Sequence, residues 1–162
     1  MSNNSLCRAK QQRNDEFYTQ YKDIKKELDY YKEFLRGKVI LCNCDNPEYS
    51  NFWKYFHTNF TSLGLRKLIA SYYDVKNPVY KSEYCGGDDS NIHSYIKTHL
   101  EGNGDFRSKE CLVLLKESDI IVTNPPFSLF REYLQTLIVG RITCSAGSGE
   151  TSSSYSPGVA ET

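Results

Sequence analysis

The residues best suited to chemistry in this sequence are Asn124, Pro125, Pro126 and Phe127, which directly follow the apolar run 120–123. The Asn side-chain oxygen and a proline carbonyl can both accept hydrogen bonds from one amino group, and neither proline can donate. Two acceptors on a planar –NH2 group draw its lone pair out of conjugation and aim it at an electrophile, which is catalysis by orientation. Phe127 offers a flat face on which a base can stack. The alternative for this tetrapeptide is a Pro-Pro turn with a buried Phe.

Three apolar segments indicate the sheet that must position this turn. Residues 39–42 and 120–123 are short runs of the kind found in strands buried on both faces, and 65–73 is expected as a further strand. Two prolines cannot continue a central strand, so residues 124–127 lie at a carboxyl end, where open α/β sheets bind ligands. Strands that alternate with helices predict a mostly parallel, doubly wound α/β sheet.

Helices are expected between and after these strands, each with a recognisable start or stop signal. The expected helices are residues 21–35 before Gly37, residues 49–60 capped by Asp45 and Asn46, a helix capped by Ser108, and residues 128–138 capped by Ser128. The stretch 74–104 is rich in turn signals, with one short element expected at 92–100.

Three further motifs accompany the Asn-Pro-Pro-Phe turn. Residues 14–19 read Asn-Asp-Glu-Phe-Tyr-Thr, residues 41–47 read Leu-Cys-Asn-Cys-Asp-Asn-Pro, and residues 104–108 read Gly-Asp-Phe-Arg-Ser. In this order, the four motifs resemble those of the EcoRI-type adenine-specific DNA methyltransferases over residues 13–138. The turn after the first strand lacks the glycines usual in the wider superfamily, but it is close to the Cys-Asn-Cys-Asp-x-Pro string of this subgroup.

The resemblance implies a Rossmann-like S-adenosylmethionine-dependent methyltransferase sheet, incomplete after its fourth strand. It assigns catalysis to Asn124, Pro125, Pro126 and Phe127, and cofactor binding to Phe17, Tyr18, Thr19, Asn43, Asp45, Asp105 and Phe106. Asp105 would receive the adenine amino group of the cofactor. Asp45 has a second expected role as a helix cap. Asp74 is the nearest candidate for the ribose hydroxyls, and S-adenosyl-L-methionine is the implied cofactor.

The activity implied by the resemblance is site-specific methylation of adenine N6 in double-stranded DNA, within a restriction-modification system. The target adenine would be flipped out of the duplex and seated on Phe127. Asn-Pro-Pro-Phe turns also serve RNA guanine-N2 and protein glutamine methyltransferases, so these remain alternatives. A third alternative is a non-catalytic remnant that binds cofactor only.

The length and the end of the chain suggest an incomplete domain. Residues 1–12 are polar and expected to be flexible, 13–138 are expected to form the amino-terminal part of a methyltransferase domain, and 139–162 are expected to be a disordered Ser/Gly-rich tail. Only one expected helix follows the catalytic turn. We therefore expect a truncated product, with a frame-shifted end as one origin of the tail, marginal solubility and little or no methylation by this chain alone.

The composition fits one domain without a special environment. The chain has 162 residues, and 20 Lys+Arg balance 20 Asp+Glu, which argues against a generally basic nucleic-acid coat. No apolar run could cross a bilayer and no signal peptide is evident, so a cytoplasmic monomer is expected. Six cysteines without a C-x-x-C pair favour neither a disulfide scaffold nor a metal site.

Overall fold

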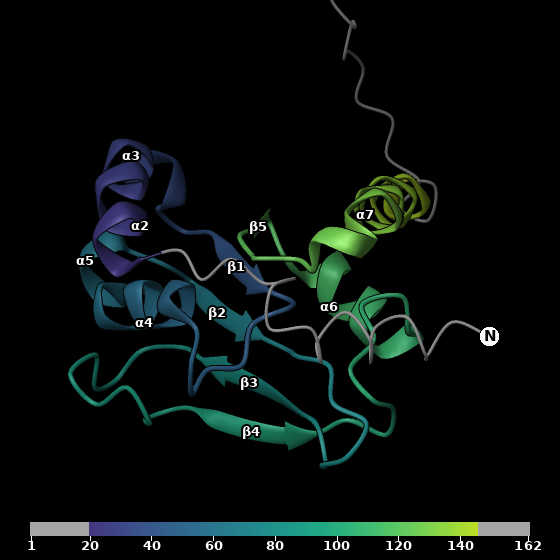
Figure 1. Ribbon diagram of the computed structural model, residues 1–162. Helices are drawn as coiled ribbons and strands as arrows, with labels where there is room; N and C mark the ends of the chain where they lie inside the picture. Colours follow the sequence, from purple (N-terminus) through teal and green to yellow (C-terminus); the bar gives the residue numbers. More distant parts are fainter. Residues whose placement is uncertain (1–19, 146–162) are drawn as a thin grey trace, which may run out of the picture.

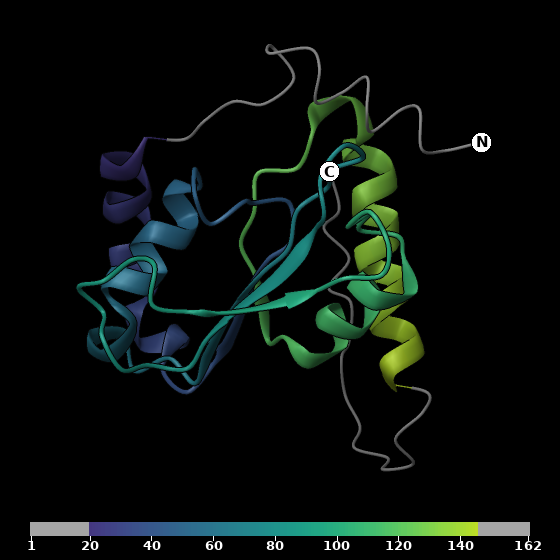
Figure 2. The ribbon, with the colours of Figure 1, turned by 90° about the horizontal axis from the view of Figure 1, so that it is seen from below.

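The centre of the molecule is a five-stranded sheet. The computed structural model describes residues 20–145, with side chains described for residues 20–139. The strands are β1 (Val39–Cys42), β2 (Lys67–Ala70), β3 (Tyr80–Tyr84), β4 (Ile96–His99) and β5 (Ile120–Ile121), in the order β4-β3-β2-β1-β5. Helices cover both faces of the sheet (Figures 1 and 2), which makes this a three-layer α/β structure.

The two helical layers follow from the alternation of side chains along the central strand β1. Ile40 and Cys42 pack in the core beneath the helices of one face, whereas Val39 and Leu41 pack against Leu115 on the other. The helices of the first face are α2 (Tyr21–Leu28), α3 (Lys32–Leu35), α4 (Asn51–Thr58) and α5 (Phe60–Leu63), and those of the second are α6 (Lys109–Glu117) and α7 (Phe130–Ser145). Burial on both faces explains why β1 is apolar throughout.

The sheet is parallel at its centre and on one side only. Strand β1 pairs in parallel with β2 and with β5, while the pairs β2–β3 and β3–β4 are antiparallel. The predicted mostly parallel sheet is therefore correct for β1, β2 and β5 and wrong for the other edge. The connection over residues 71–79 contains no helix, and a parallel return needs a crossover of about a dozen residues or more. Strand β3 must consequently run antiparallel to β2.

Two of the predicted helices differ from the observed ones, one in its cap and one by an interruption. Asp45 and Asn46 do not cap α4: Ser50 does, because its Oγ accepts a hydrogen bond from the Trp53 amide (3.1 Å). The predicted first helix is interrupted after Leu28 by the 3-10 turn η1 (Asp29–Tyr31), where Asp and two consecutive Tyr have lower helix propensity. Ser108 caps α6 as predicted, since its Oγ accepts from the Cys111 amide (3.2 Å).

The last helix also differs from its prediction at both ends. Ser128 lies within the 3-10 turn η2 (Phe127–Leu129), in which the Leu129 amide donates to the Pro126 carbonyl (3.0 Å), and α7 begins at Phe130. The helix then continues to Ser145, beyond the predicted domain end at Ile138. The remainder of the predicted tail, the predicted flexible start and Phe17, Tyr18 and Thr19 lie outside the described residues.

Within residues 20–145, no helix has both the length and the apolar character needed to cross a membrane.

Candidate active site at the carboxyl ends of the parallel strands

The site is built where the three parallel strands β1, β2 and β5 end. The turn after β1 adjoins the end of β2, because the Ser71 amide donates to the Cys42 carbonyl (3.1 Å) and the Asp45 amide to the Ser71 carbonyl (3.2 Å). The Asn-Pro-Pro-Phe turn follows β5 on the other side of β1. Residues distant in the sequence therefore meet at one edge of the sheet, where α/β proteins bind ligands.

The four residues of the Asn-Pro-Pro-Phe turn differ in exposure. Asn124 and Pro125 are half-buried and Pro126 is fully buried, so the turn is anchored in the protein. Phe127 is 58% exposed. Its ring is thus presented to solvent and does not belong to the core, which excludes the alternative of a Pro-Pro turn with a buried Phe.

Hydrogen bonds join this turn to the turn after β1. The Thr123 hydroxyl donates to Asp45 Oδ2 (2.8 Å) and accepts from the Cys44 amide (3.1 Å). The Asn124 amide also donates to Asp45 Oδ2 (3.4 Å), and Ser50 Oγ donates to Asp45 Oδ1 (2.9 Å). Both carboxylate oxygens of Asp45 are therefore engaged by groups of the protein.

The side chain of Asn43 is engaged in a similar way. Its Oδ1 accepts a hydrogen bond of 2.5 Å from the Tyr133 hydroxyl on α7. Both residues are almost completely buried, and burial raises the pKa of Tyr133 well above its usual value. Tyr133 therefore stays protonated and keeps donating. The side chains of Asn43 and Asp45, both predicted to bind the cofactor, are thus bonded to Tyr133 on α7 and to Thr123 and the Asn124 amide, respectively.

The loop before α6 holds the other two predicted cofactor residues within the described chain. Asp105 and Phe106 are 6% and 4% exposed. Asp105 accepts three hydrogen bonds from Arg107: from the amide to Oδ1 (2.8 Å), from Nε to Oδ1 (2.9 Å) and from Nη2 to Oδ2 (2.8 Å). These hydrogen bonds raise the pKa of Arg107, whose Nη1 also donates to Glu132 on α7 (2.7 Å). Arg107 thus ties the loop to α7.

Gly104 brings this loop against the end of β2. Its φ of +76° is in the left-handed region, and a Cβ placed there would lie 1.7 Å from the Tyr72 carbonyl oxygen. Only glycine fits this approach. Phe106 then packs edge to face against Tyr133 with ring centroids 5.2 Å apart, in a small cluster with Tyr73 and Leu129. The loop, the end of β2 and the helix after the Asn-Pro-Pro-Phe turn share this cluster.

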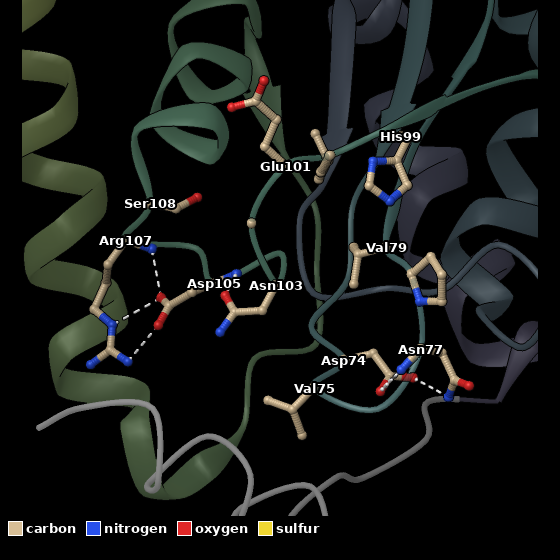
Figure 3. A pocket seen from close by; sticks show the side chains of 13 residues that line it. Asp74, Val75, Asn77, Val79, His99, Glu101, Asn103, Asp105, Arg107 and Ser108 are labelled. Carbon is tan, nitrogen blue, oxygen red and sulfur yellow. Dashed lines mark hydrogen bonds and ion pairs between the residues drawn. The ribbon is translucent and has the colours of Figure 1, made fainter.

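An open cavity of about 800 Å³ lies beside the loop (Figure 3). Asp74 and Asp105 both line it, as does the segment that leads from β4 to Asp105. The carboxylate of Asp74 closes a local turn by accepting from the Lys76 amide (2.8 Å) and from Asn77 Nδ2 (3.0 Å). The structure therefore places two predicted acidic contacts at one cavity, which the sequence alone could not show.

Two site residues were missed by the sequence reasoning. Thr123 is the polar last residue of an otherwise apolar run, and a hydroxyl at that position was a usable signal. Arg107 stands two residues after Asp105 in the motif of residues 104–108, but nothing in the pattern indicated that it bonds the Asp105 carboxylate. Among the side chains of residues 20–139, no group of three or more His, Cys, Asp or Glu gathers as a metal site would require.

Comparisons with known proteins place these motifs in a family. The family model described as adenine-specific methyltransferase EcoRI matches residues 5–141. Type II methyltransferase M.EcoRI of Escherichia coli is 50% identical over 153 residues, which cover 85% of this chain and 46% of that protein. Type II methyltransferase M.MpnI of Mycoplasma pneumoniae is 46% identical over 127 residues, which cover 78% of this chain and 38% of that protein.

A third relative, Type II methyltransferase M.MgeORF184P of Mycoplasma genitalium, is 40% identical over 131 residues, 81% of this chain and 39% of that protein. The chain thus spans less than half the length of each of these relatives. No solved structure matches it. Because the family model covers most of the sequence and its predicted motifs, the chain belongs to the EcoRI family of adenine-specific methyltransferases.

Proposed function

We propose that this chain carries the base-binding turn and the cofactor site of a site-specific DNA adenine-N6 methyltransferase of a restriction-modification system. The observation that carries the proposal is the Asn-Pro-Pro-Phe turn, anchored by the buried Pro126, with Phe127 exposed at the carboxyl end of a parallel strand. The family name supports adenine as the target base and methyl transfer as the reaction.

The turn offers the groups that an extruded adenine needs. The Phe127 ring provides a stacking surface, and the Asn124 side-chain oxygen and the Pro125 carbonyl can each accept a hydrogen bond from N6. Holding both N6 protons frees the nitrogen lone pair from the ring system and directs it out of the base plane. Since adenine N6 is inaccessible inside a duplex, the substrate in this proposal is a flipped base of double-stranded DNA.

S-adenosyl-L-methionine is the proposed cofactor, and it supplies an electrophilic methyl group on a sulfonium. The cavity beside Asp74 and Asp105 fits its adenosine part, since Gly104 removes the Cβ that would keep the loop away from β2. A carboxylate offers about four acceptor positions. The three bonds from Arg107 leave Asp105 able to accept from one further donor, such as an amino group. Phe17, Tyr18 and Thr19 remain proposed contacts of the methionine part.

The test of this proposal identifies the methylated base. The purified chain is incubated with methyl-labelled cofactor and, in separate reactions, with duplex DNA, RNA or protein, and each product is digested to identify the labelled nucleoside or amino acid. The expected product is labelled N6-methyladenine, at the low yield that the sequence predicts for this chain alone, and it is lost in the Asn124→Ala variant. Asn91→Ala is a suitable control, because Asn91 is exposed between β3 and β4 and lies outside both the turn and the cavity. Label in RNA guanine or in protein glutamine would contradict the proposal.

A chain that binds cofactor without transferring methyl groups is the second candidate. It is favoured by one observation, that the chain spans less than half the length of its curated relatives. Calorimetric titration with S-adenosylmethionine separates the two candidates. Heat of binding together with label in DNA supports the first, and heat of binding without label supports the second.

A further inference from the structure

We propose that Asp45 and Thr123 are positioning residues that hold the Asn-Pro-Pro-Phe turn, and that Asp45 does not contact the cofactor. This inference rests on the proposed function, because it takes that turn as the site of the target base. It concerns the turn after β1, which the sequence assigned to cofactor binding.

The Asp45 carboxylate is held by donors of the protein itself. It is 8% exposed, and its oxygens accept from Ser50 Oγ (2.9 Å), Thr123 Oγ1 (2.8 Å) and the Asn124 amide (3.4 Å). Two of these three donors belong to the residue before the catalytic Asn and to that Asn itself. Asp105 also accepts three hydrogen bonds, but it lines the open cavity, whereas Asp45 is not among the residues that line it. The Asp45 carboxylate instead fixes the backbone from which the Asn124 side chain projects.

The Thr123 hydroxyl acts as a relay, that is, it links the Cys44 amide to the Asp45 carboxylate through two hydrogen bonds. It accepts from the Cys44 amide (3.1 Å) and donates to Asp45 Oδ2 (2.8 Å), so its rotation is fixed by one bond in each direction. The relay joins β5 to the turn after β1 beyond the last ladder bond, from the Val122 amide to the Leu41 carbonyl (3.0 Å). Serine could replace threonine in this relay, whereas valine, of nearly the same shape, could not.

The chain that follows the Asn-Pro-Pro-Phe turn is also bonded to the turn after β1. Tyr133 on α7 donates to Asn43 Oδ1 (2.5 Å), so the turn after β1 also holds the helix that follows Phe127. Residues 43–45 therefore bond to the chain on both sides of the candidate catalytic residues. Because a misplacement of about 1 Å can cost roughly a hundredfold in rate, such bracing bears directly on orientation catalysis.

The experiment compares Thr123→Val, Thr123→Ser and Asp45→Asn in the whole chain. Amide hydrogen exchange of Cys44 and Asn124 is measured by NMR, and affinity for S-adenosylmethionine by calorimetry. Thr123→Val and Asp45→Asn should speed exchange of the Asn124 amide by about tenfold or more, because local opening of the turn no longer has to break the hydrogen bonds that join Cys44, Thr123 and Asp45. Thr123→Ser should restore exchange to within about twofold of wild type. Cofactor affinity should stay within about threefold in all three variants.

Each possible result decides the matter. Wild-type exchange at Cys44 and Asn124 in Thr123→Val would overturn the proposal, and so would a loss of cofactor binding in Asp45→Asn with exchange unchanged. If Thr123→Val does not fold, the same comparison is made with Asp45→Asn and Thr123→Ser. A wild-type chain that binds no cofactor and methylates nothing would count against the proposed function. The hydrogen-exchange data test independently whether Asp45 and Thr123 hold the turn. Where methylation is measurable, Thr123→Val should lower kcat and leave the KM for cofactor unchanged.

Discussion

Two phenylalanines in the predicted motifs have opposite environments. Phe127 is 58% exposed at the carboxyl edge of the sheet, whereas Phe106 is 4% exposed and packs edge to face on Tyr133. Packing in the core does not account for a phenylalanine ring that is mostly exposed, whereas a ring buried in a cluster stabilises the fold. At the scale of single residues, exposure therefore separates a ring that can receive a base from one that holds the loop before α6.

Replacing each ring by alanine tests this distinction. Phe127→Ala should leave the free energy of unfolding within about 0.5 kcal/mol of wild type, because little packing is lost. Phe106→Ala, the matched control, should cost about 3–5 kcal/mol. Phe127→Ala should weaken binding of an adenine-rich single-stranded oligonucleotide by about 1–3 kcal/mol, the usual contribution of one stacked base. Urea unfolding and fluorescence anisotropy measure the two quantities, and equal destabilisation by both variants would make Phe127 a packing residue.

At the scale of elements, the sequence predicted the strands whose burial gives them a continuous apolar pattern. It did not predict the strand pairing that depends on tertiary contacts. The apolar runs of β1 and β5 were recognisable because both faces of these strands meet helices or core residues. Strand β3 reads Tyr-Lys-Ser-Glu-Tyr and alternates only partly, so its pairing with β2 was not visible. The assignment of the candidate site residues stays a prediction. The helix cap assigned to Asp45 and Asn46 is wrong, because a carboxylate such as Asp45 can bond several partners and the sequence does not rank them.

The loop before α6 gives a prediction about one element contact. Gly104→Ala places a Cβ 1.7 Å from the Tyr72 carbonyl oxygen, whereas Gly37→Ala meets nothing within 4 Å at a similar positive φ of +71°. Gly37→Ala should therefore cost about 1–2 kcal/mol, the strain of the left-handed conformation alone. Gly104→Ala should cost clearly more in urea unfolding, since the loop or the end of β2 must move. Equal costs would contradict the close approach.

The break between α2 and α3 gives a prediction about pH. Hydrogen bonds from Lys25 and then Lys32, together with one from the Tyr55 hydroxyl (3.1 Å), lower the pKa of Asp29 from 3.8 to about 2. A folded-state pKa below the unfolded value of about 3.9 stabilises the fold above that pH, and this stabilisation is lost as the pH falls towards 2. Urea unfolding of wild type and Asp29→Asn should thus differ most above pH 4 and converge below it.

The control for the pH prediction is Asp23→Asn in the preceding helix α2. Asp23 is exposed and lies in the first turn of α2. Its variant removes one surface carboxylate, and the pH dependence measured for it between pH 6 and 3 is subtracted from that of Asp29→Asn. A difference between wild type and Asp29→Asn that stays constant over this range would show that the carboxylate of Asp29 contributes nothing through its charge.

At the scale of the whole molecule, the sheet ends on one side at β5, a half-buried edge strand. Strand β5 pairs with β1 on one side only, and it is two residues long. Beside it, α7 exposes Phe130, Leu134 and Ile138, spaced four apart along one stripe, by 48%, 41% and 59%. The family relatives are more than twice as long as the matched region.

The exposed stripe of α7 should therefore decide how this chain behaves in solution. Apolar patches of this kind drive association, so we expect self-association that rises with protein concentration. The double variant Leu134→Ser and Ile138→Ser should lower the sedimentation coefficient towards that of a monomer at a small cost in Tm, because the two residues are 41% and 59% exposed. Phe34→Ser is the matched control, since Phe34 is 71% exposed on α3, across the sheet from α7, and its loss should leave association unchanged. If Phe34→Ser disperses the protein and the double variant does not, association runs through the other helical layer and the stripe on α7 is ordinary surface.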